Sequence, residues 1–228
     1  NYGLRARSMR IFPGFSLDGK KVSKPEKFAS PPILKHFYPN FLQFRFSPFQ
    51  GVDVTAEYWL PSSQTIACRM SFHNQTTKTL DLHYELYGVL TPLEGQSLAP
   101  TRLQSVNVLA GKTSNLEPVV FLTGGALHGS GPGTSLLLDV KLAPLASRNF
   151  TWVQAALTDA QASFDLARRT AARPWDKEKA RILLTNAAQV VDIETGDPDW
   201  DAALAFSQPT AWRLFFNGGD HLPHPSFV

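Results

Sequence analysis

Residues 80–86 read Leu-Asp-Leu-His-Tyr-Glu-Leu, and this stretch decides the fold. Apolar residues at its odd places alternate with polar residues at its even places. Successive side chains of a β-strand point to opposite faces, so a period of two predicts a strand with one buried and one polar face. The same period is found at residues 42–46, 52–60 and 66–72. At least four half-buried strands are therefore expected.

Turn-forming residues separate these strands, and less regular strands are expected at 106–109, 118–122, 135–142 and 149–155. Many antiparallel strands joined by short turns, without helices between them, favour a sandwich or a barrel. Because the strands are long and numerous, we expect a large antiparallel two-sheet β-sandwich. Residues 1–36 are interrupted by Pro and Gly, and they are expected to form loops with one or two short strands.

The pattern changes at Thr158, where Thr158-Asp159-Ala160-Gln161 has the sequence of a capping box. Residues rich in Ala, Leu and Arg follow and predict a helix that Pro174 stops. Another helical segment is expected from about Trp175. Asp197-Pro198 predicts a further helix, with Asp197 as the N-cap and Pro at the first helical position.

Composition limits the classes of function. The chain has 228 residues, 43% of them hydrophobic and 18% charged, which is enough apolar material for a sizeable core. Its 16 Phe and 5 Trp suit a β-rich core first, and sugar-stacking surfaces second. The net charge is +3, and the basic residues are scattered, so no nucleic acid partner is expected. No apolar run is long enough to span a bilayer, so no membrane partner is expected.

Cys68 is the only cysteine, which excludes an intrachain disulfide. The period of two places it on the face that also carries Ile66, Met70 and Phe72. We therefore expect a buried structural thiol and not a nucleophile.

No metal site is expected. Asp197, Asp199 and Asp201 have the spacing of the first ligands of a calcium loop, but Ala202 stands where that loop needs Gly and Gln208 where it needs Glu. Acidic residues at a helix N-terminus are stabilising without a metal.

The histidines of the tail do not form a metal motif either. His221 and His224 lack a third and a fourth ligand at any standard spacing. The glycine-rich stretch 123–134 has no Gly-Lys-Ser/Thr ending, so it is no phosphate-binding loop. No serine lies in a nucleophile elbow, and no acid/base pair is evident. We therefore expect no cofactor and assign no catalytic residue.

Three segments carry a resemblance to a known family: Ala-Ala-Arg-Pro-Trp-Asp-Lys-Glu at 171–178, Gly-Asp-Pro-Asp-Trp-Asp-Ala-Ala-Leu at 196–204, and His-Leu-Pro-His-Pro-Ser-Phe-Val at 221–228. Together with residues 2–7 and 56–61, they resemble bacterial proteins related to glycogen debranching enzymes, within the six-hairpin glycosidase superfamily. The resemblance covers nearly the whole chain, and none of its motifs is a catalytic signature.

The resemblance implies an amino-terminal supersandwich, a helical linker and an (α/α)6 barrel. On this plan the chain divides into a β-sandwich with its leader (1–157), the linker (158–190), and the first helix and loop of a truncated barrel (191–228). In such enzymes two carboxylates on later barrel helices act as general acid and general base. None of those residues can be carried onto this sequence.

The leading hypothesis is a non-catalytic amino-terminal fragment of a glycoside hydrolase that acts on α-glucan-like oligosaccharides. Its expected partners are the carboxy-terminal catalytic barrel and, through the parent protein, carbohydrate. Loops at the mouth of such scaffolds bind ligands, so His221 and His224 of the tail are expected substrate contacts, together with Trp212 of the preceding helix. No signal peptide is visible, and a cytoplasmic location is the expectation, although the chain begins at Asn1.

Two alternatives remain open. One is a stand-alone carbohydrate-binding or interaction module, which needs an exposed aromatic platform such as Trp59 or Tyr87. The other is a fragment of a glycoside phosphorylase, which shares the two-domain plan and differs in its dependence on phosphate.

We predict self-association through residues 199–216. Trp200, Leu204 and Phe215 are among the apolar residues of this helix, and burying one large side chain is worth about 2 kcal/mol. A second copy of the chain would cover the sides that the sandwich does not face. Sedimentation of the chain with and without residues 197–228 tests this; a monomer in both cases would contradict it.

Overall fold

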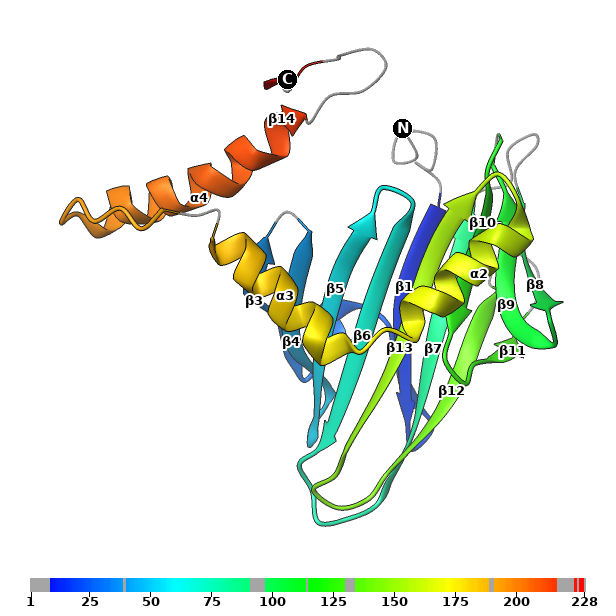
Figure 1. The fold of residues 1–228 in the computed structure, drawn as a ribbon. Helices are drawn as coiled ribbons and strands as arrows, with labels where there is room; N and C mark the ends of the chain where they lie inside the picture. The colour runs from blue at the N-terminus through cyan, green and yellow to red at the C-terminus, as the bar shows by residue number, and fades with distance from the viewer. Residues whose placement is uncertain are drawn as a thin grey trace. The chain divides into compact units, whose positions relative to one another are not determined.

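The computed structural model of the chain describes residues 9–38, 40–90, 97–113, 115–129, 134–188, 191–216, 224 and 226–227. Within these residues the fold is mainly β, with two large antiparallel sheets of five and eight strands and three α-helices (Figure 1). The predicted two-sheet β-sandwich followed by a few helices is thereby confirmed. The chain divides into two units, residues 1–35 with 42–173 and residues 36–41 with 174–228. The sequence-based division at residues 158 and 191 stays a prediction.

The smaller sheet of the first unit has the strand order β11-β12-β7-β1-β2. Its central strand, β7 (Leu80–Leu90), contains the alternating stretch and pairs with β1 on one side and β12 on the other. The bounds of the other strands are β1 (Met9–Leu17), β2 (Lys20–Val22), β11 (Ala126–His128) and β12 (Ser135–Leu142).

Strand β1 lies in the segment that was expected to be an irregular leader. It pairs with β7 over its whole length, including Pro13 and Gly14, which look like turn residues in the sequence. The close approach of the Tyr87 ring explains why a glycine stands at position 14. A Cβ atom at this position would lie 2.7 Å from Cε2 of Tyr87. Much of the leader is therefore an integral part of the smaller sheet.

The larger sheet has the order β3-β4-β5-β6-β13-β10-β9-β8. Pro31 and Pro32 lie in β3, an edge strand, where a missing N–H group is tolerated. A short 3-10 helix, Pro25–Lys27, precedes it. The bounds are β3 (Ser30–Tyr38), β4 (Phe41–Phe49), β5 (Val52–Ser62), β6 (Thr65–Asn74), β8 (Ser97–Leu103), β9 (Val106–Lys112), β10 (Glu117–Leu122) and β13 (Ser147–Leu157).

The core lies between the two sheets and is rich in aromatic rings. Phe15 and Tyr84 of the smaller sheet pack against Phe72 and Phe150 of the larger sheet, with ring centroids 4.7–6.0 Å apart. Packed aromatic pairs add about 0.5–1.5 kcal/mol each beyond the area that they bury. These contacts explain why the Phe-rich strands form a sandwich.

Cys68 belongs to this core. It is fully buried, and its Sγ atom lies 3.6 Å from Sδ of Met70. Phe72 is buried with them, as the alternation predicts. Ile66 differs from the expectation, because at the beginning of β6 it remains 36% exposed.

Helix α2 (Ala160–Ala171) covers part of the outer face of the larger sheet, beside β10 and β13 (Figure 1). Its Phe164 is fully buried against Val108 and Val119. The N-cap is Asp159, whose Oδ1 accepts a hydrogen bond from the N–H of Ala162 at 2.8 Å. The helix therefore starts one residue later than the capping box at Thr158 predicts.

The second unit contains helices α3 (Trp175–Ala187) and α4 (Pro198–Leu214) and the short strands β14 (Phe215–Phe216) and β15 (Ser226–Phe227). Asp197 caps α4 as predicted, since its Oδ1 accepts from the N–H of Asp199 at 2.9 Å. Phe206 stacks on Phe37 at 6.2 Å between centroids, yet it remains 65% exposed. Trp200 is 64% exposed. Among the described residues, no helix is long and apolar enough to span a bilayer.

We predict that Cys68 reacts with a thiol reagent only when the protein unfolds. Burial raises the pKa of the thiol, which lowers the concentration of the reactive thiolate, and also excludes the reagent. Cys68→Ala should lower the free energy of unfolding by about 1–2 kcal/mol, since a small buried group is removed. Reaction of the native protein at the rate of a free small thiol would contradict this assignment.

Candidate functional site

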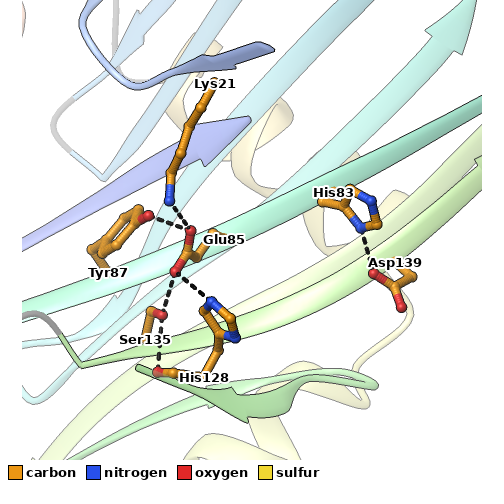
Figure 2. Close-up of polar contacts among 7 residues, drawn as sticks. All are labelled: Lys21, His83, Glu85, Tyr87, His128, Ser135 and Asp139. Carbon is orange, nitrogen blue, oxygen red and sulfur yellow. Dashed lines mark hydrogen bonds and ion pairs between the residues drawn. The ribbon is translucent and has the colours of Figure 1, made fainter. Parts of the chain in front are cut away.

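Strand β7 turns one face to the core and the other to the outside of the smaller sheet. Leu82, Tyr84 and Leu86 are buried in the core. His83 and Glu85 alternate with them, so they lie on the outer face, as does Tyr87 (Figure 2). The outer face carries the polar half of the alternation that predicts the fold.

The register of the sheet brings residues distant in sequence to this face. Tyr87 is paired with Phe12 of β1 and with Ser135 of β12, and Ser135 is paired with His128 of β11. These four residues form one row across four strands. Glu85 lies two residues before Tyr87 on β7, and Lys21 reaches it from β2.

Glu85 is at the centre of a polar cluster. Its Oε2 accepts hydrogen bonds from Nζ of Lys21 at 2.6 Å and from the hydroxyl of Tyr87. Its Oε1 accepts from Oγ of Ser135 at 2.6 Å, and Nε2 of His128 lies 3.9 Å away from the same oxygen (Figure 2). Glu85 is only 7% exposed, whereas the side chain of Lys21 is 52% exposed. The cluster is thus an enclosed carboxylate, and two of its neighbours, Lys21 and His128, have side chains that reach solvent.

The environment keeps Glu85 ionised. Burial alone would raise the pKa of its carboxyl group. Hydrogen bonds from Lys21, Ser135 and Tyr87 outweigh burial and hold that pKa below its usual value of 4.5. The same contacts act on the partners: the hydrogen bond to Glu85 raises the pKa of Lys21, and burial, with the bond to Glu85, raises that of Tyr87. At neutral pH the cluster therefore holds a carboxylate, an ammonium group and a neutral phenol.

Two aromatic rings adjoin the carboxylate. Phe12 and Tyr87 are stacked, with centroids 5.0 Å apart and planes at 15°. Nζ of Lys21 lies 5.0 Å from the centroid of the Tyr87 ring. Because Gly14 has no side chain, the Tyr87 ring can lie close to β1 and direct its hydroxyl to Glu85. Glycine at this position is part of the construction of the site.

A second polar pair lies beside this cluster on the same face. Nδ1 of His83 is 2.6 Å from Oδ1 of Asp139 on the neighbouring strand β12 (Figure 2). Their side chains are 51% and 77% exposed. Unlike Glu85, this pair is open to solvent, where ion pairs contribute little to stability.

The described residues include one other buried carboxylate, Glu57 on β5 of the larger sheet. Its oxygens accept from Nε of Arg69 at 2.9 Å and from Nε2 of Gln43 at 2.8 Å. Both buried carboxylates are therefore ion-paired with a basic side chain. For Glu85 the lowered pKa keeps the carboxylate ionised, and an ionised carboxylate has no proton to donate as a general acid.

The residues expected from the sequence to contact substrate lie largely outside what the structure describes. His221 lies outside the described residues. Trp212 belongs to α4, but its side chain is not among the described ones, and His224 is exposed. Their role as substrate contacts stays a prediction.

The two aromatic residues named as possible sugar-stacking platforms differ in their exposure to solvent. Trp59 is 2% exposed, so it is no platform, and the guanidinium of Arg173 lies 5.3 Å from the centroid of its ring. Tyr87 lies on the outer face and is partly exposed, as the hypothesis of a carbohydrate-binding module requires.

Among the described residues, no group of three His, Cys, Asp or Glu side chains could hold a metal ion.

Sequence reasoning missed Glu85 and its partners as a site. Glu85 could have been suspected, because it stands at a polar position in a strand of strong alternation. Lys21, His128 and Ser135 lie 64, 43 and 50 residues away in sequence, and only strand order brings them to Glu85. His128 lies within the stretch 123–134, which looks like a glycine-rich loop in the sequence, whereas the structure places it at the end of the short strand β11.

No family model and no curated protein matches this sequence. Three of the solved structures that it resembles are of proteins described as carbohydrate-active enzymes. A kojibiose phosphorylase from the human microbiome is 11% identical, with a TM-score of 0.48 over 89% of this chain and 28% of the other. An aldose 1-epimerase from Escherichia coli K12 is 11% identical, with a TM-score of 0.43 over 64% of this chain and 83% of the other. A polysaccharide lyase is 12% identical, with a TM-score of 0.40 over 65% and 25%.

This chain spans about 28% of the length of the phosphorylase. With identities of 11–12% and TM-scores below 0.5, these similarities leave the function to be argued from the residues themselves. The finer resemblance to glycogen debranching enzyme-related proteins stays a prediction.

We predict that Glu85 makes stability depend on pH in the acid range. Its folded-state pKa is lowered, so its contribution is fully present above about pH 4.5 and is lost as pH falls through the folded-state pKa. Glu85→Gln should lower the free energy of unfolding by about 1–3 kcal/mol at pH 7, and the difference from the unmodified protein should shrink below pH 4.5. Urea titrations across this range measure it.

Asp139→Asn is the matched control, because it neutralises an exposed carboxylate on the same face. We expect a change within about 0.5 kcal/mol at pH 7. An equal loss in both variants, or a Glu85→Gln difference that does not depend on pH, would contradict the role given to Glu85.

Proposed function

We propose that this chain is a non-catalytic amino-terminal part of a carbohydrate-active enzyme, in which the sandwich and helices support a catalytic barrel. The observation that carries this proposal is the state of the two buried carboxylates, Glu57 and Glu85. Each is held ion-paired by a basic side chain, whereas hydrolysis of a glycosidic bond needs a carboxylic acid that is still protonated at working pH.

The order of elements supports the same role. A large sandwich is followed by α2, α3 and α4, and the segments around these helices carry the resemblance to six-hairpin glycosidases. Trp200 and Phe206 of α4 are exposed aromatic side chains, which suit a helix that packs against further helices. An α-glucan-like substrate and a hydrolase parent follow from the resemblance and belong to the proposal. A glycoside phosphorylase parent remains the alternative.

The purified chain should show no turnover of α-gluco-oligosaccharides or aryl α-glucosides above the blank. The reason is that both buried carboxylates among the described residues, Glu57 and Glu85, are ion-paired with a basic side chain. Release of reducing sugar and of the aryl group measures it, with and without inorganic phosphate. Turnover that is lost in Glu57→Gln or Glu85→Gln would overturn the proposal. Turnover that requires phosphate would favour the phosphorylase alternative and overturn the non-catalytic role.

A further inference from the structure

We propose that the outer face of the smaller sheet, around Glu85, binds a neutral oligosaccharide. The residues concerned are Phe12, Lys21, Glu85, Tyr87 and His128, which we call the Glu85 face. This inference goes beyond the proposed function, and it depends on that function only for the choice of a glucan among the probes.

The first argument is the desolvation of Glu85. A carboxylate that is 7% exposed loses hydration, and a buried ion pair is seldom a net gain in stability over apolar residues of similar size. Enclosed groups with shifted pKa values and specific charged partners are concentrated at functional sites. Here the enclosed group lies on a sheet face whose neighbouring polar side chains, Lys21 and His128, are 52% and 54% exposed. The exposed polar groups of this face suit a ligand that forms hydrogen bonds.

The second argument is the kind of polar group present. Lys21 presents N–H donors, and His128 presents a ring nitrogen that donates or accepts. His83 and Asp139 add a similar pair further along β7 and β12 on the same face. A sugar hydroxyl both donates and accepts, so it is matched by a surface on which the two kinds of group are interspersed. A ligand with only one kind of group would leave half of them unsatisfied.

Charge argues for a neutral ligand. The ammonium of Lys21 is balanced by Glu85 at 2.6 Å, and His83 is paired with Asp139. A phosphate, sulfate or uronate placed directly at the Glu85 cluster would meet a carboxylate whose ammonium partner, Lys21, is already paired. The Phe12–Tyr87 pair, half-buried beside the cluster, offers apolar and aromatic surface of the kind that polar groups accompany in ligand sites.

The geometry of the row argues for more than one sugar ring. Phe12, Tyr87, Ser135 and His128 lie opposite one another across four strands. Three strand spacings of about 4.8 Å separate its ends by roughly 14 Å, which exceeds a single hexose. Strand pairing fixes the backbone of this row, in which Phe12, Tyr87 and His128 are at least partly exposed and Ser135 is buried beneath them, so little backbone ordering opposes binding.

The test is binding of neutral trisaccharides to the full chain at pH 7, followed by ligand-observed NMR. The probes are maltotriose, isomaltotriose, cellotriose and mannotriose, with glucose and mannose as single-ring comparisons and trigalacturonate as the acidic comparison. We expect at least one neutral trisaccharide to bind at millimolar concentration, more tightly than its monosaccharide and more tightly than trigalacturonate.

Phe12→Ala should weaken this binding by about tenfold. His128→Ala removes an exposed side chain and is expected to fold normally, and it should weaken binding by about fivefold. Trp200→Ala is the matched control, because it removes an exposed aromatic side chain in the other unit, and it should leave the affinity for the trisaccharide unchanged. Urea titration of each variant establishes that it is folded under the conditions of the assay.

No binding by any neutral trisaccharide would overturn the inference, as would tighter binding of trigalacturonate or an equal loss in Trp200→Ala. These results are distinct from failure of the proposed function. Glycoside turnover by this chain would overturn the non-catalytic role and leave the binding result intact, and absence of binding would leave the non-catalytic role intact.

Discussion

The two-residue period of strand β7 is the constraint on which the rest of this structure depends. Leu82, Tyr84 and Leu86 fill the space between the sheets, and the same period sends Glu85 outward. A shift of register by one residue would exchange the two sets, exposing the core residues and burying the carboxylate among aromatic rings. The register of β7 therefore determines both which residues form the core and which residues form the candidate site.

Most of the fold could be predicted from the sequence because it depends on local periodicity. Strands β5, β6 and β7 alternate cleanly, and Asp197 caps α4 by chemistry confined to four residues. The failures have a different origin. β1 was expected to be mainly loop because Pro13 and Gly14 are turn residues in most settings, and only the approach of Tyr87 explains the glycine. Trp59 was one of two residues that the carbohydrate-binding alternative needs as an exposed platform, and it is buried by tertiary packing that alternation does not encode.

The candidate site could be predicted only in part for the same reason. Tyr87 was named as an aromatic platform on the sandwich, and Glu85 is visible as a polar residue in a strong strand. Strand order was not available from the sequence: β11-β12-β7-β1-β2 interleaves segments from both ends of the sandwich. That order alone places Lys21 and His128 on either side of Glu85. Pairing between strands that are distant in sequence thus brings the site residues together, whereas the local alternation of residues predicts only the separate strands.

The two buried carboxylates show why one of them is a candidate site and the other is a structural element. Glu57 and Glu85 are 2% and 7% exposed, and each accepts hydrogen bonds from a basic side chain. The partner of Glu57 is Arg69, whose side chain is only 15% exposed, so that pair is enclosed as a whole. The partner of Glu85 is Lys21, whose side chain is 52% exposed.

An enclosed pair neutralises its own charge and presents nothing to a ligand. In the Glu85–Lys21 pair the ammonium group reaches solvent. The Glu85 carboxylate therefore stays fixed below the surface, while Lys21 can still donate a hydrogen bond to a ligand. Binding then requires only that a hydroxyl replace water at Lys21 and His128, while Ser135 and Tyr87 hold the carboxylate in place. The asymmetry in exposure between the carboxylate and its cation is what separates the Glu85 face from an internal salt bridge.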